Sequence, residues 1–197
     1  MRHVVSEQNM ASVAAGISMI DNNVVYIYSI GNFATLRCLE QIRQDICYHN
    51  LNVNIVAMGA GFSYWSLGGS HHLLEDIAIM RTIPNIKIFL PSDEKDIDQI
   101  IKKTSKGIGP TYTRIDKSKI ANNILPNSTI TKPRLVLSGK DGFVISTGGI
   151  INDVLKSISL LKLKHHIDLG LIVISSILKE DTDFFDKKLK KNMNIFT

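Results

Sequence analysis

The chain has 197 residues, 44% of them hydrophobic and 21% charged, which excludes a largely disordered chain, and no apolar run reaches the ~20 residues of a membrane span. Two cysteines cannot form a disulfide framework, and residues 1–7 lack the apolar core of a signal peptide, so we expect a cytoplasmic protein. The net charge of +5 comes from residues 119–197, where the lysine-rich stretch 187–191 follows three aspartates, a pattern typical of a solvated helix rather than of nucleic-acid binding.

Helical and strand patterns alternate along the first part of the chain. A helix rich in small residues is predicted from Ser6, its N-cap, to about residue 20, with Glu7 in its first turn. A near-continuous apolar run over 24–29 predicts a buried strand, and apolar residues at helical spacing predict a second helix over 34–49. Further strands are expected over 53–58, 86–90 and 110–115, a glycine-rich loop over 59–69, and helices over 72–82 and from the N-cap Ser92 to Gly107. This alternation favours a parallel sheet with helices on both faces.

The pattern changes after residue 116. Residues 117–133 contain several asparagines and prolines without long periodicity, and they are interpreted as a linker between domains at 1–116 and 134–197. The second domain has strand patterns over 143–146 and 168–175, a helix pattern over 151–163, and an acidic-to-basic helix over about 181–191. The predicted fold class is therefore α/β, a parallel-sheet domain followed by a partial second α/β domain.

Four features could carry chemistry. Glu7 lies beside the small-residue helix, residues 29–33 end a buried strand next to an aromatic ring, the glycine loop ends in His71 and His72, and Arg114 ends a short strand. Three of the four lie near the carboxyl end of a strand, where open α/β sheets bind ligands. Each also has a structural interpretation, because a glutamate in a first turn matches the helix dipole and adjacent histidines are a poor metal pair. No metal site is predicted within this chain.

In their order along the chain, these features resemble transketolases that depend on thiamine diphosphate. The likeness is strong over about residues 4–116 and looser over 133–176, and it is greatest to the C-terminal subunit of split transketolases. 1-Deoxyxylulose-5-phosphate synthase is a related, weaker match. The matching segments are residues 6–10, 28–33, 40–43, 59–64, 67–77, 80–85 and 91–93.

The resemblance implies that the first domain binds the aminopyrimidine ring of the cofactor. Glu7 then matches the glutamate that hydrogen-bonds N1′ of that ring and takes part in catalysis, and Ile30 and Phe33 match the aromatic pair that packs on the ring. Ile30 departs from the usual aromatic residue, so weaker cofactor binding is expected. His71 matches a catalytic and substrate-binding histidine, and Arg114 matches an arginine that binds the sugar phosphate.

Several departures from the family pattern also carry expectations. Gly59 stands where many transketolases have another histidine that touches substrate phosphate, and Trp65 stands where a small residue is common and could narrow or cover the sugar channel. The pyrimidine-binding domain is expected to be truncated at its N-terminal end, and the second domain to be about half of its usual size. Both ends of the chain therefore resemble those of a fragment.

The G-D-G segment with which the family holds the cofactor's diphosphate and Mg²⁺ does not occur in this chain. The resemblance therefore implies thiamine diphosphate and Mg²⁺ as cofactors, with Mg²⁺ bound mainly by a partner. That partner would be an N-terminal transketolase subunit with the diphosphate-binding domain, in a dimer or heterotetramer that acts on sugar phosphates.

The function implied is the pyrimidine-binding component of a thiamine-diphosphate-dependent transketolase, a transferase that moves a two-carbon ketol unit between sugars and acts only with a partner subunit. One alternative is a truncated, inactive remnant that acts at most as a partner-binding module. Another is a thiamine enzyme like 1-deoxyxylulose-5-phosphate synthase or the β subunit of a 2-oxo acid dehydrogenase, which the segments 67–76 and 80–85 disfavour. Nucleic-acid binding is the weakest alternative, because the basic residues lack interleaved aromatics.

Overall fold

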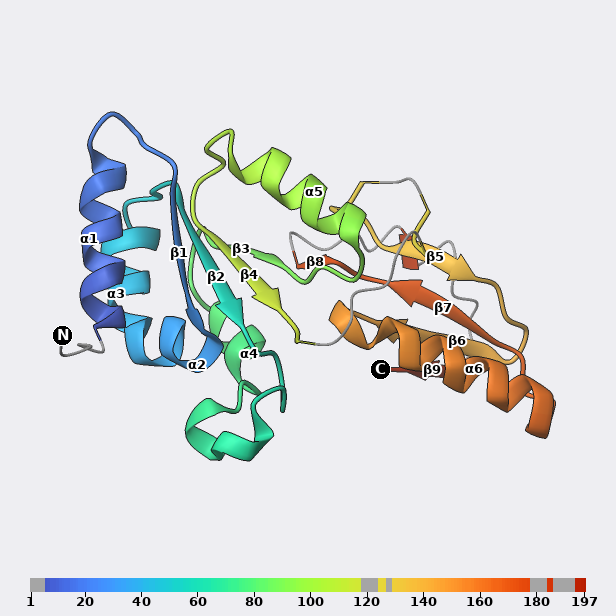
Figure 1. Ribbon diagram of the computed structural model, residues 1–197. Coiled ribbons are helices and arrows are strands. Elements are labelled where there is room, and N and C mark those ends of the chain that lie inside the picture. The colour runs from blue at the N-terminus through green and yellow to red at the C-terminus, as the bar shows by residue number, and fades with distance from the viewer. Residues whose placement is uncertain (1–5, 118–123, 127–128, 178–183, 186–193) are drawn as a thin grey trace. The chain divides into compact units, whose positions relative to one another are not determined.

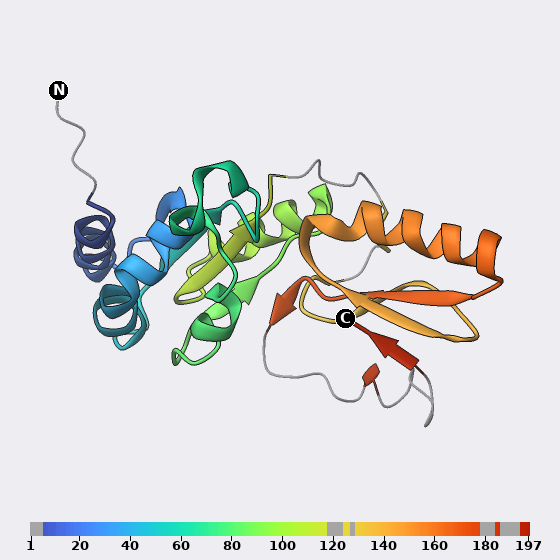
Figure 2. The ribbon, with the colours of Figure 1, turned by 90° about the horizontal axis from the view of Figure 1, so that it is seen from below.

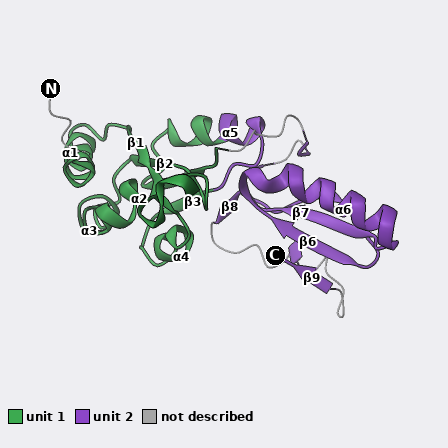
Figure 3. Cartoon of the chain, turned by 60° about the horizontal axis from the view of Figure 1, so that its bottom comes forward, with its two compact units in different colours: residues 1–89, 100–117 green, residues 90–99, 118–197 purple. Residues whose placement is uncertain are grey.

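Two units make up the computed structural model, which describes residues 6–117, 124–126, 129–177, 184–185 and 194–197 (Figure 3). Unit 1 comprises residues 1–89 and 100–117, and unit 2 comprises residues 90–99 and 118–197. The chain passes between the units at three places: between residues 89 and 90, between residues 99 and 100 within one helix, and between residues 117 and 118 in the predicted linker, part of which lies outside the described residues. The domain limits 1–116, 117–133 and 134–197 stay a prediction.

Four parallel strands of unit 1 lie in the order β1-β2-β4-β3 (Figure 1). In β2 all the residues are buried or half-buried, because the strand has a neighbour on each side. In β1, by contrast, Ile27 is buried but Tyr26 and Tyr28 are largely exposed, so the expectation of a strand buried on both faces was wrong. The bounds are β1 Val25–Ile30, β2 Val53–Met58, β3 Lys87–Phe89 and β4 Thr111–Ile115.

Helix α1 (Glu7–Met19) packs on β1 and on the segment that follows it, through Ala11, Ala14 and Ala15. The predicted single helix over 34–49 was wrong, because Thr35 leaves the helical conformation and the last part is a π-helix. The π-helical turn places Ile42, Ile46 and Cys47 in the core. The apolar spacing therefore predicted correctly that this segment has a buried side, but it did not predict the type of helix. The pieces are α2 Gly31–Ala34, η1 Leu36–Cys38, α3 Leu39–Gln41 and the π-helix η2 Ile42–Cys47.

The glycine-rich segment after β2 folds into two 3₁₀ turns, η3 (Trp65–Leu67) and η4 (Gly69–His71) (Figure 2). The helix predicted over 72–82 is only α4 (Asp76–Met80). It begins late because the backbone of Leu73 is paired with Gly61 in a short antiparallel bridge.

Helix α5 (Glu94–Thr104) has Asp93, and not the predicted Ser92, at its N-cap position. The Asp93 carboxylate accepts a hydrogen bond from the Asp96 N–H at 3.0 Å, and the Asp96 carboxylate accepts one from the Ser92 N–H at 3.0 Å. The first of these bonds satisfies a backbone donor that a helix start leaves free, and the second ties the helix to the residue before its N-cap.

Unit 2 has a sheet in the order β5-β7-β6-β9, in which β6 pairs with β7 and β9 in parallel and β5 pairs with β7 antiparallel. The β5 strand was not predicted, and the acidic-to-basic helix over 181–191 lies outside the described residues except for 184–185. The mixed α/β class with parallel strands is confirmed. The bounds are β5 Arg134–Leu137, β6 Gly142–Ser146, η5 Gly148–Ile150, α6 Ile151–His165, β7 Leu169–Val173, β8 Ser176–Ile177 and β9 Asn194–Phe196.

Candidate functional site

Glu7 is the first residue of α1, and two polar side chains hold its carboxylate against unit 1, where it is 15% exposed. Ser29, near the end of β1, donates a hydrogen bond to Glu7 Oε1 at 3.2 Å. Arg37 donates from Nη1 to Glu7 Oε2 at 3.1 Å. Ser6 occupies the N-cap position as predicted, but its side chain makes no capping hydrogen bond. Glu7 is therefore more than a dipole-matched surface charge, because two segments distant in sequence converge on it.

Phe33 lies in α2, directly after the end of β1. The Arg37 guanidinium carbon lies over the Phe33 ring, 4.0 Å from its centroid. His71, from η4, meets the same ring in a T-shaped contact with the centroids 4.9 Å apart. The fold thus joins Phe33 directly to His71, and it joins Phe33 to Glu7 through Arg37.

Ile30 is the last residue of β1, half-buried and opposite Met58 in the strand register. The next residue, Gly31, is buried against Leu73, and a Cβ at position 31 would lie 2.2 Å from Leu73 Cδ2. Any other residue at position 31 would require the Leu73 side chain to move, so glycine favours this close approach between the start of α2 and the loop that carries His71.

His71 is positioned by the loop and by α2 together. Ser70 Oγ and His71 Nδ1 lie 3.0 Å apart, and Asn32 Nδ2 donates to the Ser70 carbonyl at 2.8 Å. The loop is closed at its base by hydrogen bonds in both directions between Gly61 and Leu73, at 2.9 and 3.0 Å. The imidazole therefore sits on a tethered loop.

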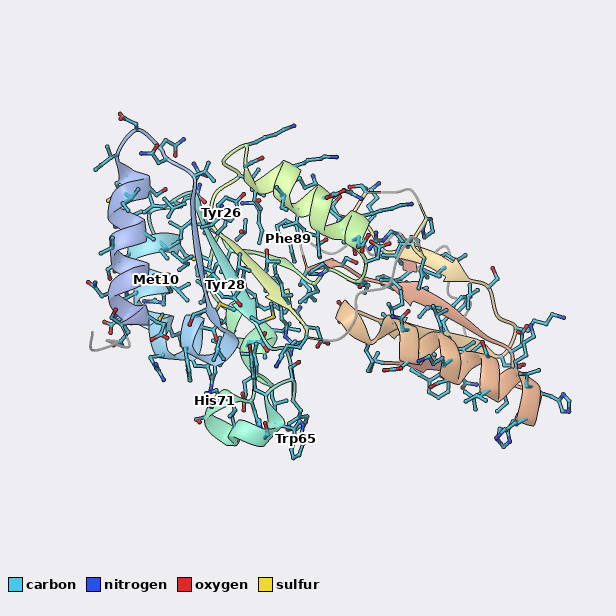
Figure 4. All side chains as sticks on the ribbon, viewed as in Figure 1. Met10, Tyr26, Tyr28, Trp65, His71 and Phe89 are labelled. Atoms are coloured by element: carbon cyan, nitrogen blue, oxygen red, sulfur yellow. The ribbon has the colours of Figure 1, made fainter. Side chains whose placement is uncertain are left out.

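Gly59 and Trp65, which like Ile30 depart from the family pattern, lie on the same loop. Gly59 has φ of +96°, and a Cβ there would lie 2.1 Å from Tyr64 Cε2, so the Tyr64 ring takes the space that another side chain would need. Trp65 is 74% exposed and lies at the outer end of the loop (Figure 4), whereas His71 is half-buried against Phe33. The expectation that Trp65 covers a sugar channel stays a prediction.

Arg114 lies on β4, and its contacts differ from those of the group around Phe33. Its Nε donates to Asp76 Oδ2 at 2.8 Å, and its Nη2 donates to the Leu73 carbonyl at 2.8 Å. The Tyr112 hydroxyl also donates to Asp76 Oδ2, and burial, followed by the Asp76 charge, holds the pKa of Tyr112 well above its ordinary value. Arg114 thus neutralises a fully buried carboxylate and fastens the segment that follows His71.

The electrostatics near Glu7 also reach Cys38. The pKa of the Cys38 thiol is raised to about 11, first by burial and second by the negative charge of the Glu7 carboxylate. The thiol therefore stays protonated at neutral pH and is not a nucleophile there. Acid–base chemistry at this site would fall to the Glu7 carboxylate and the His71 imidazole.

Sequence reasoning missed two residues that organise the site. Arg37 was hidden within the predicted helix over 34–49, although its place four residues after Phe33 signals a possible contact. Asp76 follows the glycine loop, but its pairing with Arg114 could not be foreseen from a separation of 38 residues. Both arginine contacts depend on tertiary structure.

Taken together, the geometry provides a carboxylate, an aromatic ring and an imidazole on adjoining segments. Within the described ranges, no three His, Cys, Asp or Glu side chains gather as a metal site would require. No helix in those ranges has the length and apolar character needed to cross a membrane. The arrangement suits a planar ring that bears hydrogen-bonding nitrogen atoms.

Residues 1–122 match the model of the transketolase pyrimidine-binding domain. The chain is 32% identical over 187 residues to the putative transketolase C-terminal section of Methanocaldococcus jannaschii, covering 93% of this chain and 58% of that protein. It is 27% identical to an apulose-4-phosphate transketolase subunit of Phocaeicola vulgatus, covering 98% of this chain and 62% of that one. The chain thus spans about three fifths of the length of these curated relatives.

Solved structures show the same relationship. A split-gene transketolase, described as an inactive beta4 tetramer, superposes with a TM-score of 0.78 at 29% identity, covering 92% of this chain and 59% of that one. The transketolase of Pichia stipitis in complex with sedoheptulose 7-phosphate superposes with a TM-score of 0.85 at 18% identity, covering 98% and 30%, which shows the shared fold. The chain therefore belongs to the transketolase family and carries that family's pyrimidine-binding domain.

Proposed function

We propose that this chain is the pyrimidine-binding component of a thiamine-diphosphate-dependent transketolase that transfers a two-carbon ketol unit between sugar phosphates. The observation that carries this proposal is the position of Glu7, held by Ser29 and Arg37 beside the Phe33 ring. A glutamate at the start of a helix has no structural need for partners from two distant segments. The arrangement does suit a group that must meet a ring nitrogen.

The residues present fit an aminopyrimidine. The Arg37 guanidinium is a planar group with N–H donors, and it touches both the Glu7 carboxylate and the Phe33 ring, so a planar nitrogen-bearing ring can reach both as well. Beside Phe33, Asn32 Oδ1 is buried with no hydrogen-bond partner among the described residues, which leaves an acceptor for an amino group. Glu7, Phe33 and Ile30 would hold the ring.

In this proposal each side chain has a distinct role. When bound, thiamine diphosphate supplies the electron sink for carbon–carbon bond cleavage and formation. Glu7 holds the proton at N1′ of the pyrimidine ring. His71, oriented by Ser70 and Phe33, hydrogen-bonds the substrate oxygens and moves a proton during cleavage. Arg114 offers its Nη1 side to the sugar phosphate, while its Nε and Nη2 engage Asp76 and Leu73.

A partner is part of the proposal. An N-terminal transketolase subunit would supply the diphosphate-binding domain and the Mg²⁺ ligands, in a cytoplasmic dimer or heterotetramer. The split organisation of the relatives supports this, because one is named a C-terminal section, another is named as one subunit of a transketolase, and the solved split-gene enzyme is described as an inactive tetramer of β chains.

The test is reconstitution of ketol transfer. The chain is mixed with the diphosphate-binding subunit, Mg²⁺ and thiamine diphosphate, and transfer from a ketose phosphate to an aldose phosphate is followed. We expect Glu7→Gln to lower kcat by at least about a hundredfold, the scale of a lost proton-sharing group, with the same thermal midpoint. An active Glu7→Gln complex, or an inactive wild-type complex that forms and binds the cofactor, would contradict the proposal.

A further inference from the structure

Arg37 touches the two groups that the proposed function assigns to the aminopyrimidine. Its Nη1 lies 3.1 Å from Glu7 Oε2, and its guanidinium carbon lies 4.0 Å from the Phe33 centroid, over the ring. A ring that stacks on this face of Phe33 while hydrogen-bonding Glu7 needs the space that the guanidinium takes. Two planar groups cannot share one face of a ring at contact distance.

A ligand can displace Arg37 from its contacts with Glu7 and Phe33. The Arg37 side chain is 38% exposed, and it binds Glu7 through one nitrogen rather than as a bidentate fork. Exposed single-donor ion pairs and exposed cation–π contacts are weak in water. A ligand with its own stacking face and donor can therefore replace the guanidinium at both contacts.

A place for the displaced guanidinium lies on the same side of unit 1. Arg37 lines a cavity of about 490 Å³ together with Glu40, Gln41 and Arg43. Gln41 Oε1 is buried and has no hydrogen-bond partner among the described residues. A buried acceptor without a donor is costly, and a guanidinium that turned into this cavity would satisfy it while meeting the Glu40 carboxylate.

We infer that Arg37 is a gate at the pyrimidine site: it rests on Phe33 and Glu7 until the aminopyrimidine displaces it toward Gln41 and Glu40. This inference rests on the proposed function, because it concerns the same two residues. It makes Arg37 a competitor of the cofactor rather than a ligand of it. Removal of the guanidinium should therefore strengthen cofactor binding.

The experiment measures the dissociation constant of thiamine diphosphate, at fixed Mg²⁺, for the complex of the full chain with the diphosphate-binding subunit. We expect Arg37→Ala to bind about three- to tenfold more tightly, since one exposed ion pair and one cation–π contact no longer compete. Arg43→Ala, which removes the same charge from the same cavity without touching Glu7 or Phe33, is the matched control and should leave the constant unchanged.

The outcomes separate the gate from the proposed function. Equal or weaker binding by Arg37→Ala, with the wild type still binding, overturns the gate and leaves the function intact. Absence of binding in the wild type and in every variant overturns the proposed function, and the gate with it. If Arg43→Ala tightens cofactor binding as much as Arg37→Ala does, the effect comes from the change in net charge alone, and this outcome also overturns the gate.

A second variant tests the destination of the guanidinium. Gln41→Met keeps the side-chain volume but removes the acceptor, so it should weaken cofactor binding about two- to threefold in the wild-type background and not at all in the Arg37→Ala background. The same loss in both backgrounds would show a purely structural role for Gln41 and would overturn this part of the inference.

The resting position of Arg37 can be tested by NMR. In the isotope-labelled full chain, the Arg37 Nε–H resonance should carry a ring-current shift from Phe33, and Phe33→Leu should abolish that shift. An unshifted resonance overturns the resting position.

Discussion

Arg134 in unit 2 and Arg37 in unit 1 each bind a carboxylate, but in very different surroundings. Arg134 is 2% exposed and grips both oxygens of the fully buried Asp96, at 2.6 and 2.9 Å, while also donating to Ser175 Oγ. Arg37 is 38% exposed and reaches Glu7 through a single nitrogen. The first pair is part of the framework of unit 2, because release would strand a desolvated charge. The second can be released into water, and so it can take part in ligand exchange.

Arg114 lies between these extremes. It is 19% exposed, its carboxylate partner Asp76 is fully buried, and two of its nitrogen atoms donate hydrogen bonds within unit 1. The comparison suggests that one arginine can serve both packing and substrate binding only when part of its guanidinium stays accessible. Substitution of each of the three arginines tests this ordering, and a pH measurement tests the burial of the two cysteines.

The largest effect on stability is expected at Arg134. Arg134→Ala should lower the free energy of unfolding by about 3–5 kcal/mol, because Asp96 remains buried without its cation. Urea denaturation of the full chain measures this change. Lys132→Ala, at an exposed lysine two residues away, is the matched control and should be within about 0.5 kcal/mol of the wild type.

Arg114→Ala should have an intermediate effect of about 2–3 kcal/mol, because the Tyr112 hydroxyl still donates to Asp76 after the guanidinium is lost. Adding Asp76→Asn should recover part of that loss by removing the buried charge. In the reconstituted enzyme, Arg114→Lys should raise KM for the sugar phosphate more than it lowers kcat. A lowered stability with an unchanged KM would make Arg114 a structural residue alone.

The two buried cysteines predict a loss of stability at alkaline pH. Burial raises the pKa of Cys47 to about 12 and, together with Glu7, that of Cys38 to about 11, against an ordinary value of 9.0. Between pH 9 and 11 the folded state therefore holds protons that the unfolded state releases, so stability falls as pH rises through this window, by at least about 1 kcal/mol. Denaturation at pH 8 and pH 10.5 measures the fall, and Cys47→Ala should reduce it.

The smallest effect on stability is expected at Arg37. Arg37→Ala should change the free energy of unfolding by less than about 1 kcal/mol, because the ion pair is partly exposed and Glu7 keeps its hydrogen bond from Ser29. The same urea series measures it. A loss as large as that of Arg134→Ala would place Arg37 in the framework of unit 1 and remove the basis for its release.

Much of the first unit could be predicted from local patterns. The apolar run over 53–58 coincides with β2, and the pattern over 110–115 differs from β4 by one residue. Patterns failed where tertiary contacts compete with local preference. The helix expected over 34–49 is broken at Thr35 and continues as a π-helix, because the core needs the apolar side chains on one side. The short β5 strand carries too few residues for alternation to be recognised.

The family pattern can be recognised in the amino-acid sequence alone, and so can three of the groups that lie on adjoining segments, Glu7, Phe33 and His71. Only the tertiary structure decided that Arg37 lies between Glu7 and Phe33 and that Arg114 is bound to Asp76, across separations of 30 and 38 residues. The physical reason is that local periodicity reports which side of an element is buried. The partner of a charge depends on which distant backbone segments the sheet order brings together.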